Sequence, residues 1–85
     1  MKVLIPSPLR SYTGTSEVDA EGATLADVLD DLDRRHPGLR FRIVDEQDRM
    51  RPHVRFFVDG VQVFDLGRRL AAGESVQIVQ ALSGG

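Results

Sequence analysis

The clearest periodic pattern in the chain is a stripe of apolar residues at helical spacing. Its members recur every three or four positions and so share one face of an α-helix: Leu25, Val28, Leu29 and Leu32. Thr24 precedes the stripe and Asp27 follows three positions later, which is the pattern of a helix N-cap. A His-Pro-Gly sequence over residues 36–38 is typical of a helix end. We therefore predict one helix from Thr24 to His36, with one buried face.

Two short apolar segments precede this helix. Val3–Ile5 has the composition of a strand, and Pro6 and Pro8 limit its length because proline cannot donate a backbone hydrogen bond. A Tyr-Thr-Gly sequence then predicts a turn, and Thr15–Ala20 predicts a second strand with Val18 as its main apolar residue.

The second half of the chain alternates apolar and polar residues with the period of a strand. His53–Val58 shows the alternation best, and Asp59-Gly60 predicts a type I′ hairpin turn into Val61–Val63. Ser75–Leu82 is the last predicted strand. The residues expected to point inward are Val54, Phe56, Val58, Val76 and Ile78.

The connecting segments are less regular. Leu39–Val44 alternates like a strand, yet it is equally consistent with a short buried helix. Asp45–Arg51 is a polar loop, and residues 67–73 are irregular, with Leu70 expected to be buried.

This order of elements predicts an α+β fold in which a mixed sheet packs on one main helix. The 85 residues, 41% hydrophobic and 28% charged, fit a single domain over residues 1–85, with 82–85 as a flexible tail. We expect the first and last strands to be parallel neighbours.

Composition narrows the functional classes. The chain has no cysteine, which excludes disulfides, thiolate nucleophiles and zinc–thiolate sites. No apolar run approaches the ~20 residues that span a bilayer, and the apolar start is too short for a signal peptide. We therefore expect a cytoplasmic protein that is a monomer when free and has no membrane partner.

The charges are segregated along the chain. Residues 17–33 hold seven acids and no Lys or Arg, whereas residues 34–55 hold seven arginines. A sequence pI near 5.6 argues against a nucleic-acid partner, which requires a concentrated cationic face. Solvated faces, or steering toward a partner protein, explain this asymmetry better.

Residues with catalytic chemistry are sparse. His36 and His53 lack the spacing of metal ligands, and Ser83 has no nearby histidine to activate it. The run Asp30-Asp31-Leu32-Asp33 is best explained as a solvated helix face. We predict that the protein is not an enzyme, holds no metal and binds no cofactor by itself.

The sequence Ser83-Gly84-Gly85 follows the last predicted strand. Glycine accepts φ of either sign and has no Cβ, so this segment can enter a narrow slot in another protein and present a main-chain carboxylate there. A frayed chain end is the plain alternative.

The ordered set of these segments resembles the MoaD/ThiS family of sulfur carriers, which are ubiquitin-like β-grasp proteins, and is nearest to the CysO-like subgroup. The residues that carry the resemblance are Ile5–Arg10, the helix after Thr24, His36–Leu39, Val54–Gly60 and Leu70–Ile78 leading to Gly84-Gly85. Gln80 stands where this family commonly has proline.

The resemblance implies a carrier function centred on Gly85. An E1-like adenylating enzyme of the MoeB/ThiF type would use ATP to adenylate the Gly85 carboxylate, and a sulfur donor would convert it to a thiocarboxylate. A sulfur-accepting biosynthetic enzyme would be the second partner, in a pathway making cysteine, molybdopterin, thiamin or another sulfur-containing metabolite. The alternatives are a ubiquitin-like modifier joined through Gly85 to target lysines, and a passive interaction module.

The partner enzymes should contact exposed apolar residues close to the tail. If Phe56 points inward, Phe57 points outward, and resemblance to ubiquitin places Phe57 in an exposed apolar patch. A slip of one residue in register would instead bury Phe57 and expose Phe56. The residues predicted to bind partners are Leu9, Phe57, Val79, Ala81, Leu82, Ser83 and Gly84. For Leu9, a position in the core is the alternative.

Overall fold

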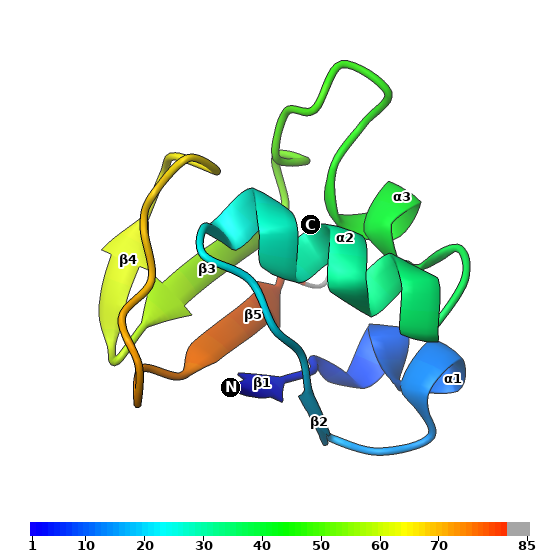
Figure 1. The fold of residues 1–85 in the computed structure, drawn as a ribbon. Coiled ribbons are helices and arrows are strands. Elements are labelled where there is room, and N and C mark those ends of the chain that lie inside the picture. The colour runs from blue at the N-terminus through cyan, green and yellow to red at the C-terminus, as the bar shows by residue number, and fades with distance from the viewer. Residues whose placement is uncertain (82–85) are drawn as a thin grey trace.

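A computed structural model describes residues 1–81, whose strands form one mixed sheet under a long helix (Figure 1). The strand order is β2-β1-β5-β3-β4, with β1 and β5 parallel and all other neighbours antiparallel. This arrangement confirms the predicted pairing of the first and last strands. The strands are β1 (Lys2–Leu4), β2 (Glu17–Asp19), β3 (Val54–Val58), β4 (Val61–Val63) and β5 (Val76–Gln80).

The predicted helix is α2 (Leu25–Arg35). The hydroxyl of Thr24 accepts a hydrogen bond from the backbone N–H of Asp27 at 3.2 Å, so the predicted N-cap is present. The apolar stripe of α2 is completely buried against inward-facing residues of the sheet, including Val3, Phe56 and Ile78. These contacts form the hydrophobic core.

One carboxylate, Asp31, is buried on α2. It accepts hydrogen bonds from the backbone N–H of Glu21 and from the guanidinium groups of Arg34 and Arg35. The Glu21 N–H is the main cause of a lowered Asp31 pKa, the two arginines add to it, and desolvation opposes them. Asp31 therefore joins the β2–α2 connection to the helix as a paired anion.

The ambiguous segment after α2 is a short helix, α3 (Leu39–Ile43). Gly38 begins it with φ of 94°, a left-handed conformation that glycine adopts without strain. The Asp33 carboxylate accepts the backbone N–H groups of Gly38 and Arg40, both at 3.1 Å. These contacts favour the helical alternative because the last turn of α2 holds the first N–H groups of α3.

The β3–β4 hairpin has the predicted turn. Asp59 and Gly60 have φ of 47° and 84°, as a type I′ turn requires. The Asp59 carboxylate also accepts the backbone N–H of Ser75 at 2.9 Å. The turn is therefore connected to the residue that precedes β5.

The segment after β1 differs from the prediction. The sequence predicted a strand limited by Pro6 and Pro8 and then a Tyr-Thr-Gly turn. The structure has a 3₁₀ helix there, η1 (Ser7–Leu9), and a short helix, α1 (Arg10–Thr13), which ends at Gly14. Pro8 lies in the first turn of η1, where its missing N–H has no helical partner to lose. The prolines thus begin a helical segment as well as ending a strand, and this segment turns Leu9 inward.

Leu70 is less buried than expected. It is half-buried and packs on the edge of the core, and its backbone N–H donates to Ala23. Among residues 1–81 there is no helix with the length and apolar character needed to cross a bilayer.

Candidate functional site

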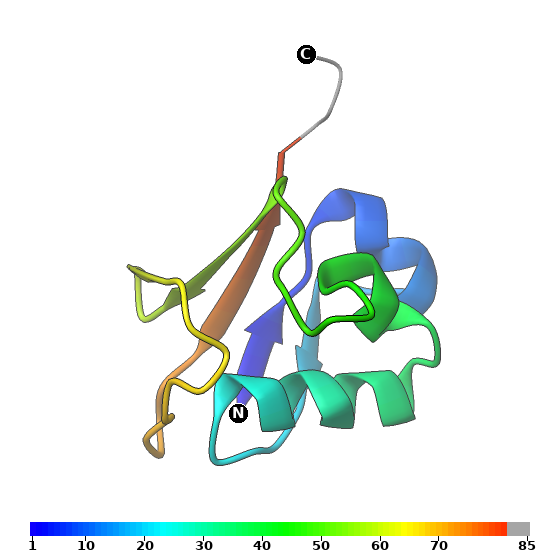
Figure 2. The same ribbon diagram turned by 90° about the horizontal axis from the view of Figure 1, so that it is seen from above.

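The C-terminal end of β5 is the point from which residues 82–85 continue. β5 lies between β1 and β3, and its end lies at one end of the molecule, whereas α2 lies at the other (Figure 2). Ala81, just past the strand, donates its backbone N–H to the carbonyl of His53 at 2.9 Å. The sheet therefore fixes the chain as far as Ala81. The predicted site residues Leu82, Ser83, Gly84 and Gly85 lie outside the described residues.

Gln80 is the last residue of β5, and its ladder partner is Val54. A glutamine at the position where the family commonly has proline is thus compatible with a regular strand to its end. Its amide oxygen is buried and accepts no hydrogen bond from residues 1–81.

The outer face of the sheet carries an apolar strip beside this strand end. Phe57 lies directly opposite Gln77, and Val79 lies opposite Arg55, so these side chains share the face turned away from α2. Phe56 is fully buried, whereas Phe57 and Val79 are half-buried. The register is therefore the predicted one, and the alternative with Phe57 inward is excluded. Leu4 of β1, 36% exposed, extends the strip and was missed by sequence reasoning.

The prediction that Leu9 belongs to an exposed patch was wrong. Leu9 is only 2% exposed and belongs to the core cluster. The 3₁₀ turn of η1 accounts for this, because it directs Leu9 under the sheet while Ser7 and Pro8 remain exposed. Ala81, by contrast, is exposed as predicted.

A shallow groove of about 580 Å³ separates η1 from β5 on the side of the strand end. Val79 and Gln80 line one wall, and Pro6, Pro8 and Arg10 line the other. Its lining contains no carboxylate side chain. Leu4 and Val79 belong both to the apolar strip and to the lining of this groove.

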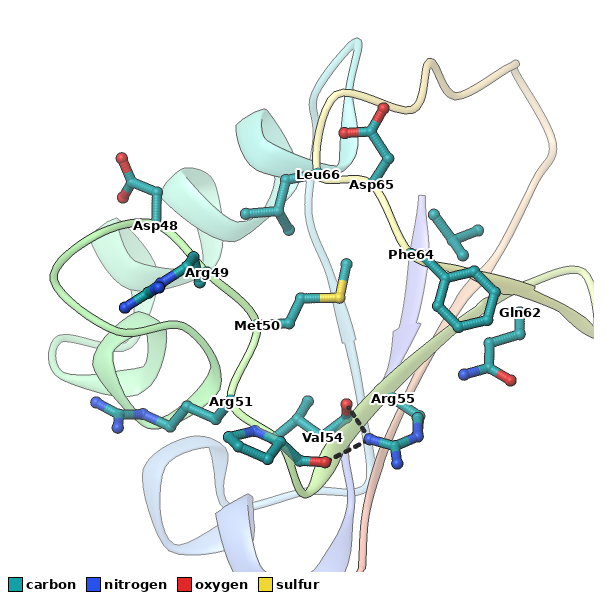
Figure 3. Close-up of a pocket in the computed structure, with 12 residues that line it drawn as sticks. Asp48, Arg49, Met50, Arg51, Val54, Arg55, Gln62, Phe64, Asp65 and Leu66 are labelled. Carbon is teal, nitrogen blue, oxygen red and sulfur yellow. Dashed lines mark hydrogen bonds between the residues drawn. The ribbon is translucent and has the colours of Figure 1, made fainter.

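A second groove, of about 550 Å³, lies between the 48–52 loop and the end of β4 (Figure 3). Phe64 stands at its rim with 79% of its surface exposed, and Met50 forms part of its floor. Arg55 crosses it and donates hydrogen bonds to the carbonyls of Pro52 and Val54. Neither His36 nor His53 lines this groove.

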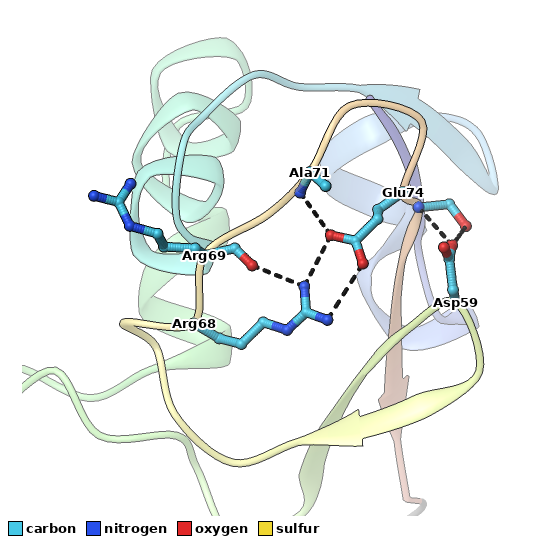
Figure 4. Close-up of polar contacts among 6 residues, drawn as sticks. Asp59, Arg68, Arg69, Ala71 and Glu74 are labelled. Carbon is cyan, nitrogen blue, oxygen red and sulfur yellow. Dashed lines mark hydrogen bonds and ion pairs between the residues drawn. The ribbon is translucent and has the colours of Figure 1, made fainter.

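The start of β5 is built very differently, from a closed set of polar contacts (Figure 4). The Glu74 carboxylate accepts two hydrogen bonds from Arg68, at 2.9 and 3.2 Å, and one from the backbone N–H of Ala71. The hydrogen bonds from Arg68, and to a lesser extent the one from Ala71, lower the pKa of Glu74. The hydrogen bonds to Glu74 in turn raise the pKa of Arg68. Asp59 accepts from both the N–H and the hydroxyl of Ser75.

The two histidines lie apart from each other in the described region. Residues 1–81 contain no cluster of three or more His, Asp or Glu side chains placed to hold a metal ion. His53 lines a small hollow with Arg51 and Gln80, next to the end of β5, whereas His36 lies at the end of α2. The arrangement thus places an apolar strip, the η1–β5 groove and the hollow around His53 beside the strand from which residues 82–85 continue.

Comparison with known proteins identifies relatives over almost the whole chain. Residues 3–85 match the family described as the ThiS family, and the match includes Gly84 and Gly85. The sulfur carrier protein CysO of Mycobacterium tuberculosis is 35% identical over 89 residues, covering 98% of this chain and 96% of the relative. Small archaeal modifier protein 1 of Haloferax volcanii is 33% identical over 72 residues, covering 84% of this chain and 82% of the relative.

A solved structure agrees with these relatives. The crystal structure of the Amycolatopsis orientalis BexX/CysO complex aligns with a TM-score of 0.90 and 32% identity, covering 99% of this chain and 98% of that chain. This likeness and the strand order confirm the ubiquitin-like β-grasp fold that the sequence predicted.

Proposed function

We propose a function from the premise that the chain belongs to the ThiS family: it is a sulfur carrier whose chemistry takes place on the Gly85 carboxylate. The observation that carries the proposal is the family match through Gly85, together with 35% identity to a protein named as a sulfur carrier. The fixed end of β5 supports it, because a rigid body then presents the residues after Ala81 from a constant position.

The first chemical step would be adenylation. A carboxylate is a poor electrophile, since resonance and negative charge oppose nucleophilic attack. In the proposed step a Gly85 carboxylate oxygen attacks the α-phosphorus of ATP in an E1-like enzyme, and pyrophosphate leaves. The product is an acyl-adenylate, whose carbonyl carbon now bears a good leaving group.

The second step would introduce sulfur. A sulfide-level nucleophile attacks the adenylate carbonyl, AMP leaves with the bonding electrons, and a thiocarboxylate forms. That group is anionic and nucleophilic, so a biosynthetic enzyme can accept its sulfur. The carrier needs no catalytic side chain of its own for either step.

The body of the protein would supply the docking surface. Leu4, Phe57 and Val79 are exposed or half-buried apolar residues on the outer face of the sheet, and Ala81 is an exposed one just past β5. An apolar patch of this kind beside a chain exit favours a protein interface. The BexX/CysO complex supports a protein partner, because a CysO protein is bound to another protein there.

The test is a reconstitution with ATP, Mg²⁺, sulfide and an E1-like adenylating enzyme encoded by the same genome. Intact mass spectrometry should show the gain expected when one oxygen is replaced by sulfur. A matched sample with residues added after Gly85 should show no change in mass. Equal sulfur loading of both proteins would refute the proposal.

A second candidate is a ubiquitin-like modifier, favoured by the similarity to small archaeal modifier protein 1. Adenylation of Gly85 would be shared, and a target lysine would take the place of the sulfur nucleophile. Tryptic digests of cells that express the protein distinguish the two functions. Branched peptides carrying Gly84-Gly85 on lysines of other proteins would support the modifier.

A further inference from the structure

The arginines of this protein fall into two groups. Arg34, Arg35, Arg40, Arg49 and Arg68 each form an ion pair with a carboxylate. Within residues 1–81, the other arginines have no carboxylate within ion-pair distance: Arg10, Arg42, Arg51, Arg55 and Arg69. Since acids are in slight excess over the whole chain, a shortage of carboxylates does not explain the second group.

All but one of the unpaired arginines surround the end of β5. Arg10 lines the same groove as Gln80, and Arg42 and Arg51 line the hollow on the other side of Gln80. Arg55 lies directly opposite Val79 in the β-ladder. We call Arg10, Arg42, Arg51 and Arg55 the arginine collar. Arg69 is the exception, in the loop that pairs with Thr24 at the start of α2.

Three members of the collar are held in place by neutral partners. Arg10 donates Nε to the carbonyl of Ile5, and Arg55 donates to the carbonyls of Pro52 and Val54 (Figure 3). Arg51 donates Nε to the carbonyl of Phe41 and lies over its ring, 4.6 Å from the centroid. These contacts orient the guanidinium groups without neutralising their charge, and each keeps N–H donors for a carboxylate.

Within residues 1–81, acids near the collar do not form ion pairs with it. Asp45 pairs with Arg49, and the pKa of Asp45 is lowered mainly by the backbone N–H of Arg49, with the charge of Arg51 as a smaller contribution. Neither the η1–β5 groove nor the hollow around His53 has a carboxylate side chain in its lining. In the groove of Figure 3, Asp48 pairs with Arg40, and Asp65 accepts the backbone N–H of Gly67.

The opposite end of the molecule differs in how its charges are paired. α2 lies opposite the end of β5 (Figure 2), and its Asp30 and Asp31 carboxylates form ion pairs with Arg40, Arg34 and Arg35. Charges on α2 are thus largely neutralised within the fold, whereas the collar arginines have no carboxylate within ion-pair distance among residues 1–81.

We propose that the arginine collar docks on an acidic protein surface, the rim of carboxylates around the slot that receives the tail. This inference rests on the proposed function. The apolar strip implies only an apolar partner surface, and the collar adds that carboxylates lie beside it. Oriented arginines recognise carboxylates well, and opposite charges accelerate encounter. The positive charges of the collar would also steer this end of the molecule toward an acidic rim.

A nucleotide phosphate is the alternative target, and the geometry disfavours it. The collar surrounds residues 79–81, whereas adenylation takes place at Gly85, four residues beyond Ala81. An extended chain of that length spans roughly 14 Å, so a tail inserted in a slot separates the collar from the reacting phosphorus. The collar is then left at the mouth of the slot, against protein.

The experiment compares Arg42→Glu with Arg69→Glu in ATP–pyrophosphate exchange catalysed by the E1-like enzyme. Both side chains are exposed, and neither makes a side-chain hydrogen bond or ion pair within residues 1–81, so the two substitutions change net charge equally at opposite ends. Arg42→Glu should raise the KM for the carrier about fivefold at low salt, with kcat and the KM for ATP unchanged. Arg69→Glu should change the carrier KM less than about twofold.

Added salt should reduce the difference, because the Debye length is about 10 Å at 0.1 M and shorter above it. Arg55→Glu should reproduce the Arg42→Glu effect, and thermal unfolding should show that all variants remain folded. Equal carrier KM values for Arg42→Glu and Arg69→Glu would overturn the proposal that the collar docks on an acidic surface. An effect confined to the KM for ATP would also overturn it. Absence of exchange with the unsubstituted protein would instead overturn the proposed function.

Discussion

The two ends of β5 differ in how the polar side chains around them are paired. At its start, Glu74, Arg68, Asp59 and Ser75 satisfy one another through hydrogen bonds and an ion pair. At its other end, Arg10, Arg51 and Arg55 of the collar donate hydrogen bonds only to backbone carbonyls. Neither the Arg42 side chain nor the amide oxygen of Gln80 has a hydrogen-bond partner within residues 1–81.

The difference separates stability from recognition within one strand. Groups that are satisfied internally make a turn rigid and offer little to a partner. Guanidinium groups that are oriented by carbonyls and keep their charge have N–H donors left for a partner. The closed end thus connects β5 to the hairpin turn, and in the proposed function the open end is the part of the strand that a partner contacts.

The largest expected effect lies at the open end. Deleting Gly85 should abolish sulfur loading, because the reacting carboxylate would then belong to Gly84 and stop one residue short in the slot. Thermal stability should not change, since residues beyond the last strand contribute little packing. Intact mass after reconstitution measures loading, and calorimetry measures stability. Full sulfur loading of the protein that lacks Gly85 would show that the reaction does not require a tail of this length.

The next prediction compares neighbouring phenylalanines on opposite faces of β3. Phe56→Ala should destabilise the fold by about 3–5 kcal/mol, because it empties a fully buried core site. Phe57→Ala should cost about 1 kcal/mol or less, as its side chain is half-buried on the outer face. Denaturant unfolding measures both.

For binding to the E1-like enzyme, Phe57→Ala should have a larger effect than Phe56→Ala, measured with folded protein. Phe57→Ala should weaken association with the E1-like enzyme by up to ~2 kcal/mol if the apolar strip forms the centre of the interface. If Phe57→Ala left the affinity unchanged and destabilised the fold as much as Phe56→Ala, Phe57 would be a core residue. The apolar strip would then not be a binding surface.

Most of the fold could be predicted because its signals are local. The stripe of Leu25 to Leu32, the Thr24 cap and the Asp59-Gly60 turn each use contacts within a few residues. Leu39–Val44 remained ambiguous because its helix depends on the Asp33 carboxylate from the preceding element.

Parts of the site depend on contacts that span the fold. Pro6 and Pro8 indicated a strand end, and the same residues begin η1, whose turn buries Leu9. The arginine-rich segment was evident in the sequence, but the fold decides which members find carboxylates. Arg40 meets Asp30 and Asp48, whereas Arg42, two residues later, meets neither.

A smaller effect is expected from removing charge at the closed end. The lowered pKa of Glu74 means that its ionised form stabilises the fold above its unfolded-state pKa, and this contribution disappears as the pH falls through the lower folded-state pKa. Glu74→Gln should therefore lower the melting temperature at neutral pH and flatten its fall in acid. Glu46→Gln, at an exposed site without an ion pair within residues 1–81, should change neither. Parallel acid curves for the unsubstituted protein and Glu74→Gln would contradict this account.

The smallest expected effect concerns the bond between the hairpin turn and β5. Asp59→Asn keeps a residue that tolerates the positive φ of the turn, and its amide oxygen can still accept the Ser75 N–H, so stability should change by less than about 0.5 kcal/mol. Asp59→Ala loses both the acceptor and the turn preference and should cost about 1 kcal/mol. Neither substitution should alter the carrier KM in the exchange assay, because Asp59 lies at the end of β5 remote from the tail. A raised KM for Asp59→Ala, at temperatures where it is fully folded, would show that the closed end also contributes to recognition and that the division of β5 into two functional ends is incorrect.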